Sequence, residues 1–230
     1  MSEPTPDPLR NHRRVLLYSL GLLAAMVLIF IAVGKHPGAP GTTTTWSPIG
    51  RFDGDLYRAV QEHRLESVTW IAKALNIIGG GMVTIPLRIV VAAYLALRRR
   101  WFALAGWILT WVSAEVILTV TKAWFMRTRP ALPLVATSGY SFPSGHAVAG
   151  AAIAVALVLV ALPAGPHRRK WEVAAAAAAF LMALSRVYLN AHWFSDVVAG
   201  VLLGTGVALG STALVTEIRD VAVRRRPVPV

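Results

Sequence analysis

Apolar residues along the chain form six long runs separated by short polar segments. The runs cover residues 15–34, 82–97, 101–121, 147–164, 171–191 and 197–216. The hydrocarbon core of a bilayer is about 30 Å thick, so a helix needs roughly 20 residues to cross it. We therefore expect residues 1–230 to form a single all-α domain, a polytopic membrane protein built as a six-transmembrane-helix bundle.

The second run is irregular where it begins. Gly79, Gly80 and Gly81 precede it, and residues 67–78 before the glycines are also apolar. Sharp bends in long helices have local causes, and glycine is one of them. We expect this span to start early and to break at the glycines.

Basic residues predict the orientation of the bundle. They gather before the first run, between the second and third, between the fourth and fifth, and after the sixth, in residues 10–14, 98–100, 168–170 and 219–226. With six spans these four blocks lie on one side, and Lys and Arg accumulate in short cytoplasmic loops. We therefore predict a multi-pass protein of the plasma (inner) membrane whose terminal tails, residues 1–14 and 217–230, are both cytoplasmic.

The segment of residues 35–66 then forms an extracytoplasmic loop. Its first part is rich in Pro, Gly and Thr, which favour neither helix nor packing. Further on, Ile49, Phe52, Leu56 and Val60 recur at spacings of three and four. This pattern predicts a short interfacial helix along the outer surface of the membrane.

Composition excludes several classes of protein. With 56% hydrophobic and 15% charged residues, the chain lies outside the range of soluble domains. The absence of cysteine excludes a disulfide framework and a cysteine nucleophile. The net charge of +12 does not indicate nucleic-acid binding, because the basic residues fall in blocks between apolar runs. Glycines at 200, 204, 206 and 210 predict close helix packing within the bundle, and the oligomeric state stays open.

Three polar clusters interrupt the apolar pattern at the predicted outer ends of spans. The first, residues 122–130 (KAWFMRTRP), brings together Lys122, Arg127 and Arg129. These cations run against the inner-side bias of the other basic residues, and the arginine fork matches the oxygens of a phosphate. Anchoring to lipid headgroups is the alternative interpretation.

The second cluster is residues 142–146 (FPSGH), directly before an alanine-rich run. Pro143 favours a turn, Ser144 is a typical N-cap, and Gly145 permits close approach of the backbone. Free N–H groups at a helix start can bind an anion, and His146 follows at the same point. A capped helix with an incidental histidine remains the alternative.

The third cluster is residues 185–196 (SRVYLNAHWFSD). His192 and Asp196 are four residues apart at the start of the last span, so on a helix the carboxylate reaches the imidazole and fixes its tautomer. Arg186 lies within an apolar run, where a charge is costly and indicates function. A structural ion pair is the alternative.

Together the clusters resemble the three-part signature of the type-2 phosphatidic acid phosphatase superfamily. Residues 122–130 match K-x6-RP, residues 143–146 read PSGH, and residues 185–196 match SR-x5-H-x3-D. The motifs span residues 122–196, which we identify as the catalytic core, and the six-helix pattern extends the resemblance over nearly the whole chain.

The resemblance implies a role for each matching residue. His192 is the expected nucleophile, forming a phosphohistidine, with Asp196 orienting it and His146 protonating the leaving oxygen. The expected phosphate-binding groups are Lys122, Arg129, Arg186, the hydroxyl of Ser144 and the N–H of Gly145.

We expect no cofactor and no metal. Between residues 116 and 195 the only carboxylate is Glu172, at the opposite membrane boundary, so the core lacks the oxygen ligands that Mg²⁺ takes. Arg88 and Glu115, within the second and third spans, are expected to pair with each other for stability.

These observations predict an integral-membrane phosphatase that hydrolyses a lipid phosphate or lipid diphosphate at the outer face of the bilayer. Its partners are then the lipid substrate and the bilayer itself. A lipid phosphotransferase with the same intermediate is the alternative enzyme, and a non-catalytic transporter is the alternative from another class. The motifs contact only the phosphoryl end, so they do not identify the lipid.

Overall fold

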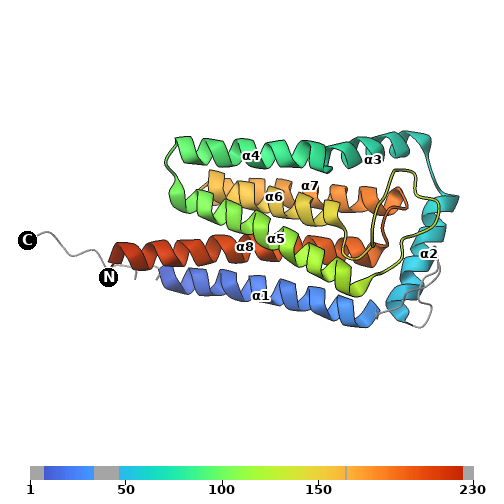
Figure 1. The fold of residues 1–230 in the computed structure, drawn as a ribbon, viewed down its shortest axis with the longest axis horizontal. Helices are drawn as coiled ribbons and strands as arrows, with labels where there is room; N and C mark the ends of the chain where they lie inside the picture. Colours follow the sequence, from blue (N-terminus) through green and yellow to red (C-terminus); the bar gives the residue numbers. More distant parts are fainter. Residues whose placement is uncertain (1–7, 34–46, 164, 225–230) are drawn as a thin grey trace, which may run out of the picture.

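The computed structural model of the chain describes residues 8–33, 47–163 and 165–224, and within these ranges all regular structure is helical (Figure 1). The helices are α1 (Pro8–Val33), α2 (Pro48–Glu62), α3 (Glu66–Ile78), α4 (Gly81–Leu97), α5 (Trp101–Phe125), α6 (Gly145–Ala161), α7 (Pro166–Tyr188) and α8 (Phe194–Arg224). Residues 35–46 of the predicted extracytoplasmic loop and the far ends of both predicted tails lie outside the described residues.

Each of the six apolar runs forms a helix. Four of these helices, α1, α5, α7 and α8, are long and apolar enough to cross a membrane. The pair α3 and α4 is bent by 44° at its break and supplies a fifth span if the two halves are taken together. The expected early start and glycine break of this span are therefore present. Helix α6 is shorter, at 17 residues, so the structure supports four to five candidate spans, and the sixth stays a prediction.

Helix α8 is the centre of the bundle. It packs against α1, α5, α6 and α7, while α3 and α4 contact α7 and α5 at the periphery (Figure 1). A Cβ at Gly200 would lie 2.8 Å from the main-chain oxygen of Ser144, and one at Gly204 would collide with the oxygen of Val148. The predicted role of these glycines in packing within the bundle is confirmed, because only glycine lets the α6 and α8 backbones come this close.

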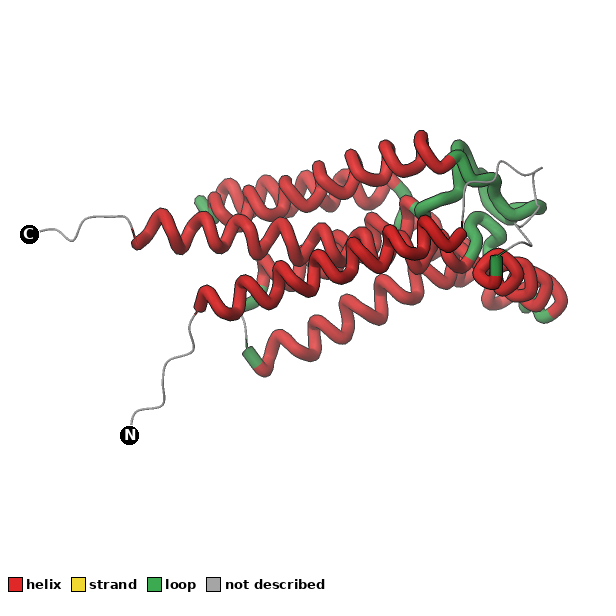
Figure 2. The backbone as a smooth tube through the Cα atoms, turned by 90° about the horizontal axis from the view of Figure 1, so that it is seen from below, coloured by secondary structure: helices red, strands yellow, loops and turns green. Residues whose placement is uncertain are grey.

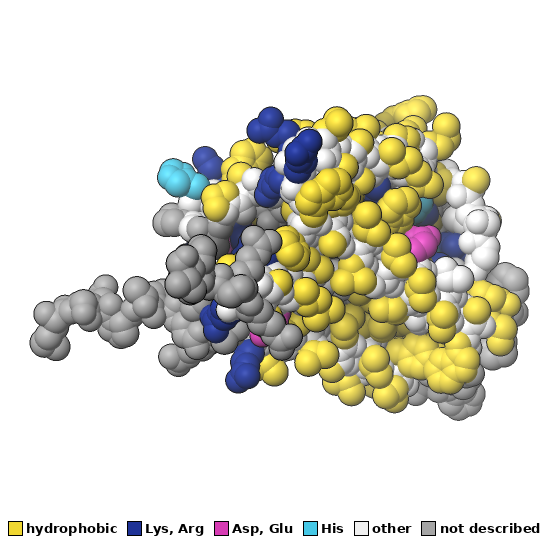
Figure 3. Space-filling view, turned by 60° about the vertical axis from the view of Figure 1, so that its left-hand side comes forward, with side chains coloured by type: hydrophobic (Ala, Val, Ile, Leu, Met, Phe, Trp, Pro, Cys, Tyr) yellow, Lys and Arg dark blue, Asp and Glu magenta, His cyan; other side chains and the backbone are white. Residues whose placement is uncertain are grey.

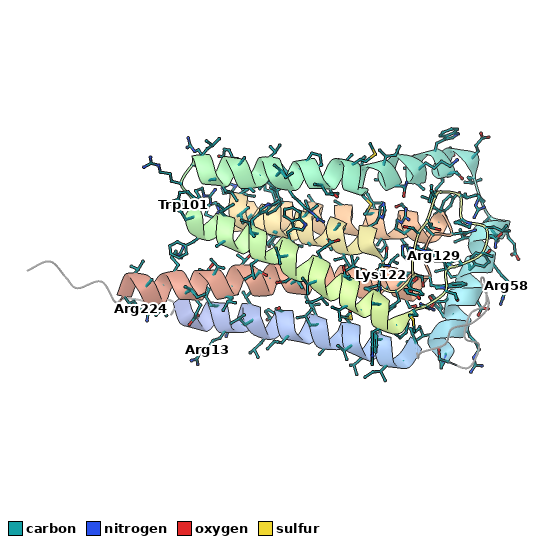
Figure 4. The ribbon with its side chains drawn as sticks, in the orientation of Figure 1. Arg13, Arg58, Trp101, Lys122, Arg129 and Arg224 are labelled. Atoms are coloured by element: carbon teal, nitrogen blue, oxygen red, sulfur yellow. The ribbon has the colours of Figure 1, made fainter. Side chains whose placement is uncertain are left out.

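The two ends of the bundle differ. Arg13 and Arg224 lie at one end near Trp101, while Lys122 and Arg129 lie at the opposite end (Figure 4). We call the first the basic end, since the starts of α1 and α7, the α4–α5 turn and the end of α8 meet there, and the second the site end. Hydrophobic side chains cover the flank between them, as a bilayer requires (Figure 3).

Helix α2 lies across the site end, roughly perpendicular to the bundle, and is seen nearly end-on in Figure 2. It begins at Pro48, and the Ser47 hydroxyl caps it by accepting from the Gly50 N–H at 3.0 Å. Helix α2 includes the segment from Ile49 to Val60, where the sequence pattern predicted a short helix. Its position over the site end is what brings it into contact with α8.

The predicted tails are shorter than expected, because α1 already begins at Pro8 and α8 continues to Arg224. The 31 residues of α8 span about 46 Å, well beyond an apolar core of about 30 Å. Arginine and glutamate are good helix formers, and no glycine or proline interrupts the sequence after the apolar run until Pro227. The helix therefore extends past the apolar run that defined it.

Candidate active site

The segment between α5 and α6 folds back over the site end. Met126, the C-cap residue directly after α5, adopts the left-handed conformation with φ of 49°, which turns the chain. The Ser141 N–H then donates to the Arg127 oxygen at 2.9 Å, and the Ser141 hydroxyl donates to the Thr128 oxygen at 3.0 Å. These bonds hold the arginines of the first cluster beside the residues that lead into the second.

Arg129 ties the first cluster to the third. Its Nη1 donates to the Ala191 oxygen at 2.7 Å, and its Nε donates to the Gly139 oxygen at 3.0 Å. Lys122 Nζ and Arg129 Nη2 both donate to the Tyr140 oxygen, at 2.5 Å and 3.2 Å. The two cations of K-x6-RP therefore converge, as the motif predicted.

His192 meets Arg129 on one side and Asp196 on the other. Arg129 Nη1 lies 3.0 Å from His192 Nε2, and His192 Nδ1 lies 3.5 Å from Asp196 Oδ2. A guanidinium has donors only, so Nε2 must carry the lone pair and the imidazole proton must sit on Nδ1, facing the carboxylate. The nitrogen without a proton thus faces the cations.

The charge state of His192 suits a nucleophile. Its side chain is 3% exposed, and this burial lowers the pKa of His192 to about 3. Asp196 opposes the shift and the positive charges of Arg129 and Arg186 add to it. The imidazole is therefore neutral at neutral pH, and its Nε2 lone pair, which a nucleophile requires, accepts from Arg129 in this structure.

The helical spacing expected for His192 and Asp196 is wrong in detail. Helix α8 begins at Phe194, so His192 precedes it in a turn that includes Asn190 with φ of 54°. Asp196 lies in the first turn of α8, and its Oδ2 accepts from the Trp193 N–H at 2.9 Å. The carboxylate therefore holds the turn in place as well as facing the imidazole.

Ser144 is the N-cap residue of α6, but its hydroxyl does not cap the helix. Its N–H instead donates to the main-chain oxygen of Asp196 at 3.0 Å, which holds the start of α6 against the start of α8. The side chain is 0% exposed, and its Oγ has no hydrogen-bond partner among the described residues. A buried hydroxyl in this condition is costly unless a ligand meets it.

Asn76, in the last turn of α3, contacts two of the predicted site residues. The main-chain oxygen of Asn76 lies 3.2 Å from His146 Nε2, and its side-chain oxygen accepts from Arg186 Nη1. Lys122, Arg129 and Arg186 all act electrostatically on His146. The eight predicted site residues therefore gather at one end of the bundle, with α3 reaching them from outside the motifs.

Sequence reasoning missed Asn76 and also Asp53, a buried carboxylate on α2. Arg127, which counted among the outer cations, is buried in ion pairs with Asp53 at 2.8 Å and Asp196 at 2.6 Å. One signal could have indicated Asp53. Gly50 and Gly54 flank it on one helical face, a pattern typical of close packing around a small polar side chain.

Arg88 and Glu115 pair as predicted, with their charged atoms 3.8 Å apart. The Arg88 guanidinium also lies 5.3 Å from the ring centre of Trp111. This pair belongs to α4 and α5, below the site end, and joins the two helices. A stabilising role fits this placement.

Comparison with known proteins identifies the family. Residues 101–220, more than half of the chain, match the PAP2 superfamily. The chain belongs to the PAP2 superfamily. The matched range contains all three motifs, whereas Asp53 and Asn76 lie outside it.

Two curated PAP2 relatives are similar in sequence. Phosphatidylglycerophosphatase B of Bacillus subtilis is 34% identical over 132 residues, which are 55% of this chain and 65% of that protein. The match thus spans less than two thirds of that relative's length. Undecaprenyl-diphosphatase of Sulfolobus acidocaldarius is 27% identical over 171 residues, covering 71% of this chain and 78% of that one.

Two solved PAP2-like structures share the fold. The transmembrane PAP2-type phosphatidylglycerolphosphate phosphatase from Bacillus subtilis superposes with a TM-score of 0.74 at 24% identity, covering 90% of this chain and 98% of that one. Aquifex aeolicus LpxE superposes with a TM-score of 0.57 at 25% identity, covering 68% and 92%. The first likeness supports the helical architecture over nearly the whole chain.

Proposed function

We propose that this protein is an integral-membrane phosphatase that hydrolyses a lipid phosphate or lipid diphosphate through a phosphohistidine. The observation that carries the proposal is His192, a buried neutral imidazole whose Nε2 lone pair faces Arg129 while its Nδ1 faces Asp196. The names of both curated relatives describe phosphatases of lipid phosphates or diphosphates. The extensive apolar flank favours a substrate that resides in the bilayer.

The reaction proceeds in two displacements. His192 Nε2 attacks phosphorus, the bond from phosphorus to the lipid oxygen breaks, and His146 gives that oxygen a proton. Water then attacks the phosphohistidine, with His146 taking its proton, and phosphate leaves as His192 is restored. In both steps charge builds up on the phosphoryl oxygens, which fixed cations stabilise.

The phosphate replaces contacts that the side chains make within the protein. Arg186 donates to the side-chain oxygen of Asn76, and Arg129 donates to loop carbonyls, so each already points to an acceptor oxygen. Phosphoryl oxygens would also meet the unpartnered hydroxyl of Ser144 and the free N–H of Gly145 at the start of α6. Binding the anion therefore requires these cations to exchange their present acceptors for phosphoryl oxygens.

Fixed cations also account for the proposed independence from metal. The structure brings a second carboxylate, Asp53, near Asp196, but Arg127 lies between the two and forms an ion pair with each of them. Hydrolysis should therefore persist in excess EDTA. Loss of activity that Mg²⁺ restores would contradict this part of the proposal.

The decisive experiment for the function uses the purified protein and a panel of lipid phosphates and diphosphates. We expect phosphate release from at least one of them. When the lipid phosphate is radiolabelled, a rapid quench should trap a labelled protein whose bond to phosphate is stable to alkali and labile to acid. The same panel incubated with a lipid alcohol tests for transfer. Phosphorylation of the alcohol in place of phosphate release would identify a phosphotransferase.

We further propose that both termini are cytoplasmic and that the site end faces the outside, since basic residues collect at the opposite end. The cysteine-free chain allows single cysteines to be labelled with an impermeant reagent on intact cells. Leu132→Cys at the site end and Arg99→Cys at the basic end are a matched pair, because both replace loop residues with positive φ. Labelling of residue 99 and not of residue 132 would show that the orientation is the opposite of the proposed one.

A further inference from the structure

Asp53 is a buried carboxylate on α2 that is bonded entirely to the site end of the bundle. It is 1% exposed. Its Oδ1 accepts from the Ser195 N–H at 2.9 Å, and its Oδ2 accepts from the Ser195 hydroxyl at 2.6 Å and from Arg127 Nη2 at 2.8 Å. Three donors around one buried carboxylate fix its orientation.

Arg127 connects Asp53 to the carboxylate beside the histidine. Its Nη1 donates to Asp196 Oδ1 at 2.6 Å and to the Ser195 hydroxyl at 2.8 Å, and its guanidinium lies 5.7 Å from the ring centre of Trp193. Burial alone would lower the pKa of Arg127, but Asp196 and Asp53 more than offset this and raise it. One permanent cation is thus held between two carboxylates.

The two oxygens of Asp196 have different partners. Oδ1 is bonded to Arg127, while Oδ2 accepts from the Trp193 N–H at 2.9 Å and lies 3.5 Å from His192 Nδ1. The bond to Arg127 therefore determines how the carboxylate plane is turned and which oxygen meets the imidazole. Neither Asp53 nor Arg127 approaches Nε2, whose neighbour is Arg129.

We propose that Asp53 and Arg127 are positioning residues for the nucleophile: they act through Asp196 to hold His192 with its proton on Nδ1 and its lone pair on Nε2. The inference rests on the proposed function for its kinetic consequence, but the tautomer is a property of the protein alone. It also assigns a role to α2, which lies outside the range that matches the PAP2 superfamily.

A merely structural role, in which Asp53 only docks α2, makes different predictions. The test variant is Asp53→Asn, which keeps the shape and can still accept from Ser195. Its control is Asp55→Asn on the same helix, since Asp55 is exposed and pairs only with Arg58 among the described residues. We expect Asp53→Asn to lower kcat by about 10- to 100-fold, as loss of an orienting second partner does at metal-bound histidines, with KM changed less than about threefold. Asp55→Asn should match the parent.

A double-mutant cycle asks whether the effect passes through Asp196. In the Asp196→Asn background the carboxylate that Asp53 and Arg127 orient is already lost, so adding Asp53→Asn should change kcat by less than about twofold. If the two losses multiply instead, Asp53 acts independently of Asp196 and the inference is wrong.

The tautomer can be measured without any turnover. Nitrogen NMR of protein labelled with ¹⁵N-histidine in detergent reports which ring nitrogen carries the proton, and His192→Gln assigns the signal. Asp196, Arg129 and Arg186 are the charged groups acting on His192, and Arg127 reaches it through Asp196. We expect the Nδ1–H form in the parent and a mixture in Asp53→Asn. An unchanged signal in Asp53→Asn would overturn the inference.

The two proposals can fail separately. If the parent protein hydrolyses no lipid phosphate but the tautomer shifts in Asp53→Asn, the proposed function is wrong and the positioning role stands. If the parent is active and Asp53→Asn behaves like Asp55→Asn in both assays, the positioning role is wrong. Should Asp53→Asn not fold, Ser195→Ala removes one donor to Asp53 and should give a smaller loss in the same direction.

Discussion

Arginines gather at both ends of the bundle, but their surroundings are opposite. At the site end Arg127 and Arg186 are 5% and 2% exposed, and Arg127 binds an acid 74 residues away. At the basic end the arginine ion pairs within the described residues are local: Arg168 pairs with Glu172 one helical turn away, and Arg219 pairs with its neighbour Asp220. Arg127 and Arg186 are thus part of the folded interior, whereas Arg168 and Arg219 form local pairs that are more exposed to the surroundings.

This difference separates two uses of positive charge. An exposed ion pair contributes little to stability, yet exposed cations at a membrane boundary bias orientation and interact with anionic lipid. A buried cation carries a desolvation cost that must be offset by partners fixed in place. Under the proposed orientation and function, the basic end would orient the protein in the membrane, while the cations at the site end would bind a phosphate.

The largest difference in kcat should separate the variants of the two histidines nearest the ends of α7. His192 follows the helix at the site end, and His167 lies exposed in its first turn at the basic end. We expect His192→Ala to lose about 10⁴-fold or more in kcat on every substrate, because the nucleophile itself is gone. His167→Ala should keep parental kcat. Phosphate release in one membrane preparation, with expression checked, compares them.

A matched pair of arginines on α7 tests the comparison directly. Arg186→Gln should lower kcat/KM by about 10²- to 10³-fold, since a fixed cation that stabilises the transition state is lost. Arg168→Gln, at the other end of the same helix, should change it by less than about twofold. Similar losses in both variants would mean that the two ends do not differ in the way described.

His146 and His192 are expected to have different roles within the site end. His146→Ala should lower kcat on a lipid phosphate by about 10²-fold, because the leaving alkoxide needs a proton. On p-nitrophenyl phosphate, whose leaving group is stable as an anion, much of that activity should return. His192→Ala should stay inactive on both substrates. If p-nitrophenyl phosphate restores activity to His192→Ala and not to His146→Ala, the assignments of nucleophile and general acid are reversed.

The smallest effect concerns stability and pH. Because the pKa of His192 is lowered to about 3 from its ordinary 6.5, the unfolded chain binds more protons than the folded one between these values. The stability contributed by the neutral buried imidazole is therefore present above pH 6.5 and is lost as pH falls toward 3. Thermal unfolding in detergent should show a larger drop in Tm from pH 7 to pH 4 for the parent than for His192→Gln. Equal drops would mean that His192 is not held neutral.

The sequence predicted the parts of the molecule that depend on local pattern. Each apolar run and each motif is continuous in the sequence, so hydrophobic length was enough to predict α5 and α7, and the family resemblance was enough to propose the residues that gather at the site end. Asn76 was missed because its partner Arg186 is 110 residues away and no local pattern marks it. Asp53 was missed for a similar reason, 74 residues from Arg127.

Local reasoning failed where a distant contact overrides a local preference. Ser144 has the sequence position of a helix cap, but the bond from its N–H to Asp196 fixes its backbone and its hydroxyl caps nothing. His192 and Asp196 have helical spacing, but the turn at Asn190 delays the start of the helix to Phe194. For Ser144 the competing partner is the main chain of Asp196, whereas for His192 it is the local turn at Asn190.

The central position of α8 also has a consequence for biosynthesis. It is the last of the described helices to leave the ribosome, yet α1, α5, α6 and α7 all pack on it and it carries Asp196. Until α8 inserts, the start of α6 lacks the oxygen that holds Ser144, and Arg127 lacks one of its two carboxylates. A chain that is still being translated thus has its first two motifs in the membrane without an assembled site, so under the proposed function hydrolysis begins only when α8 has inserted.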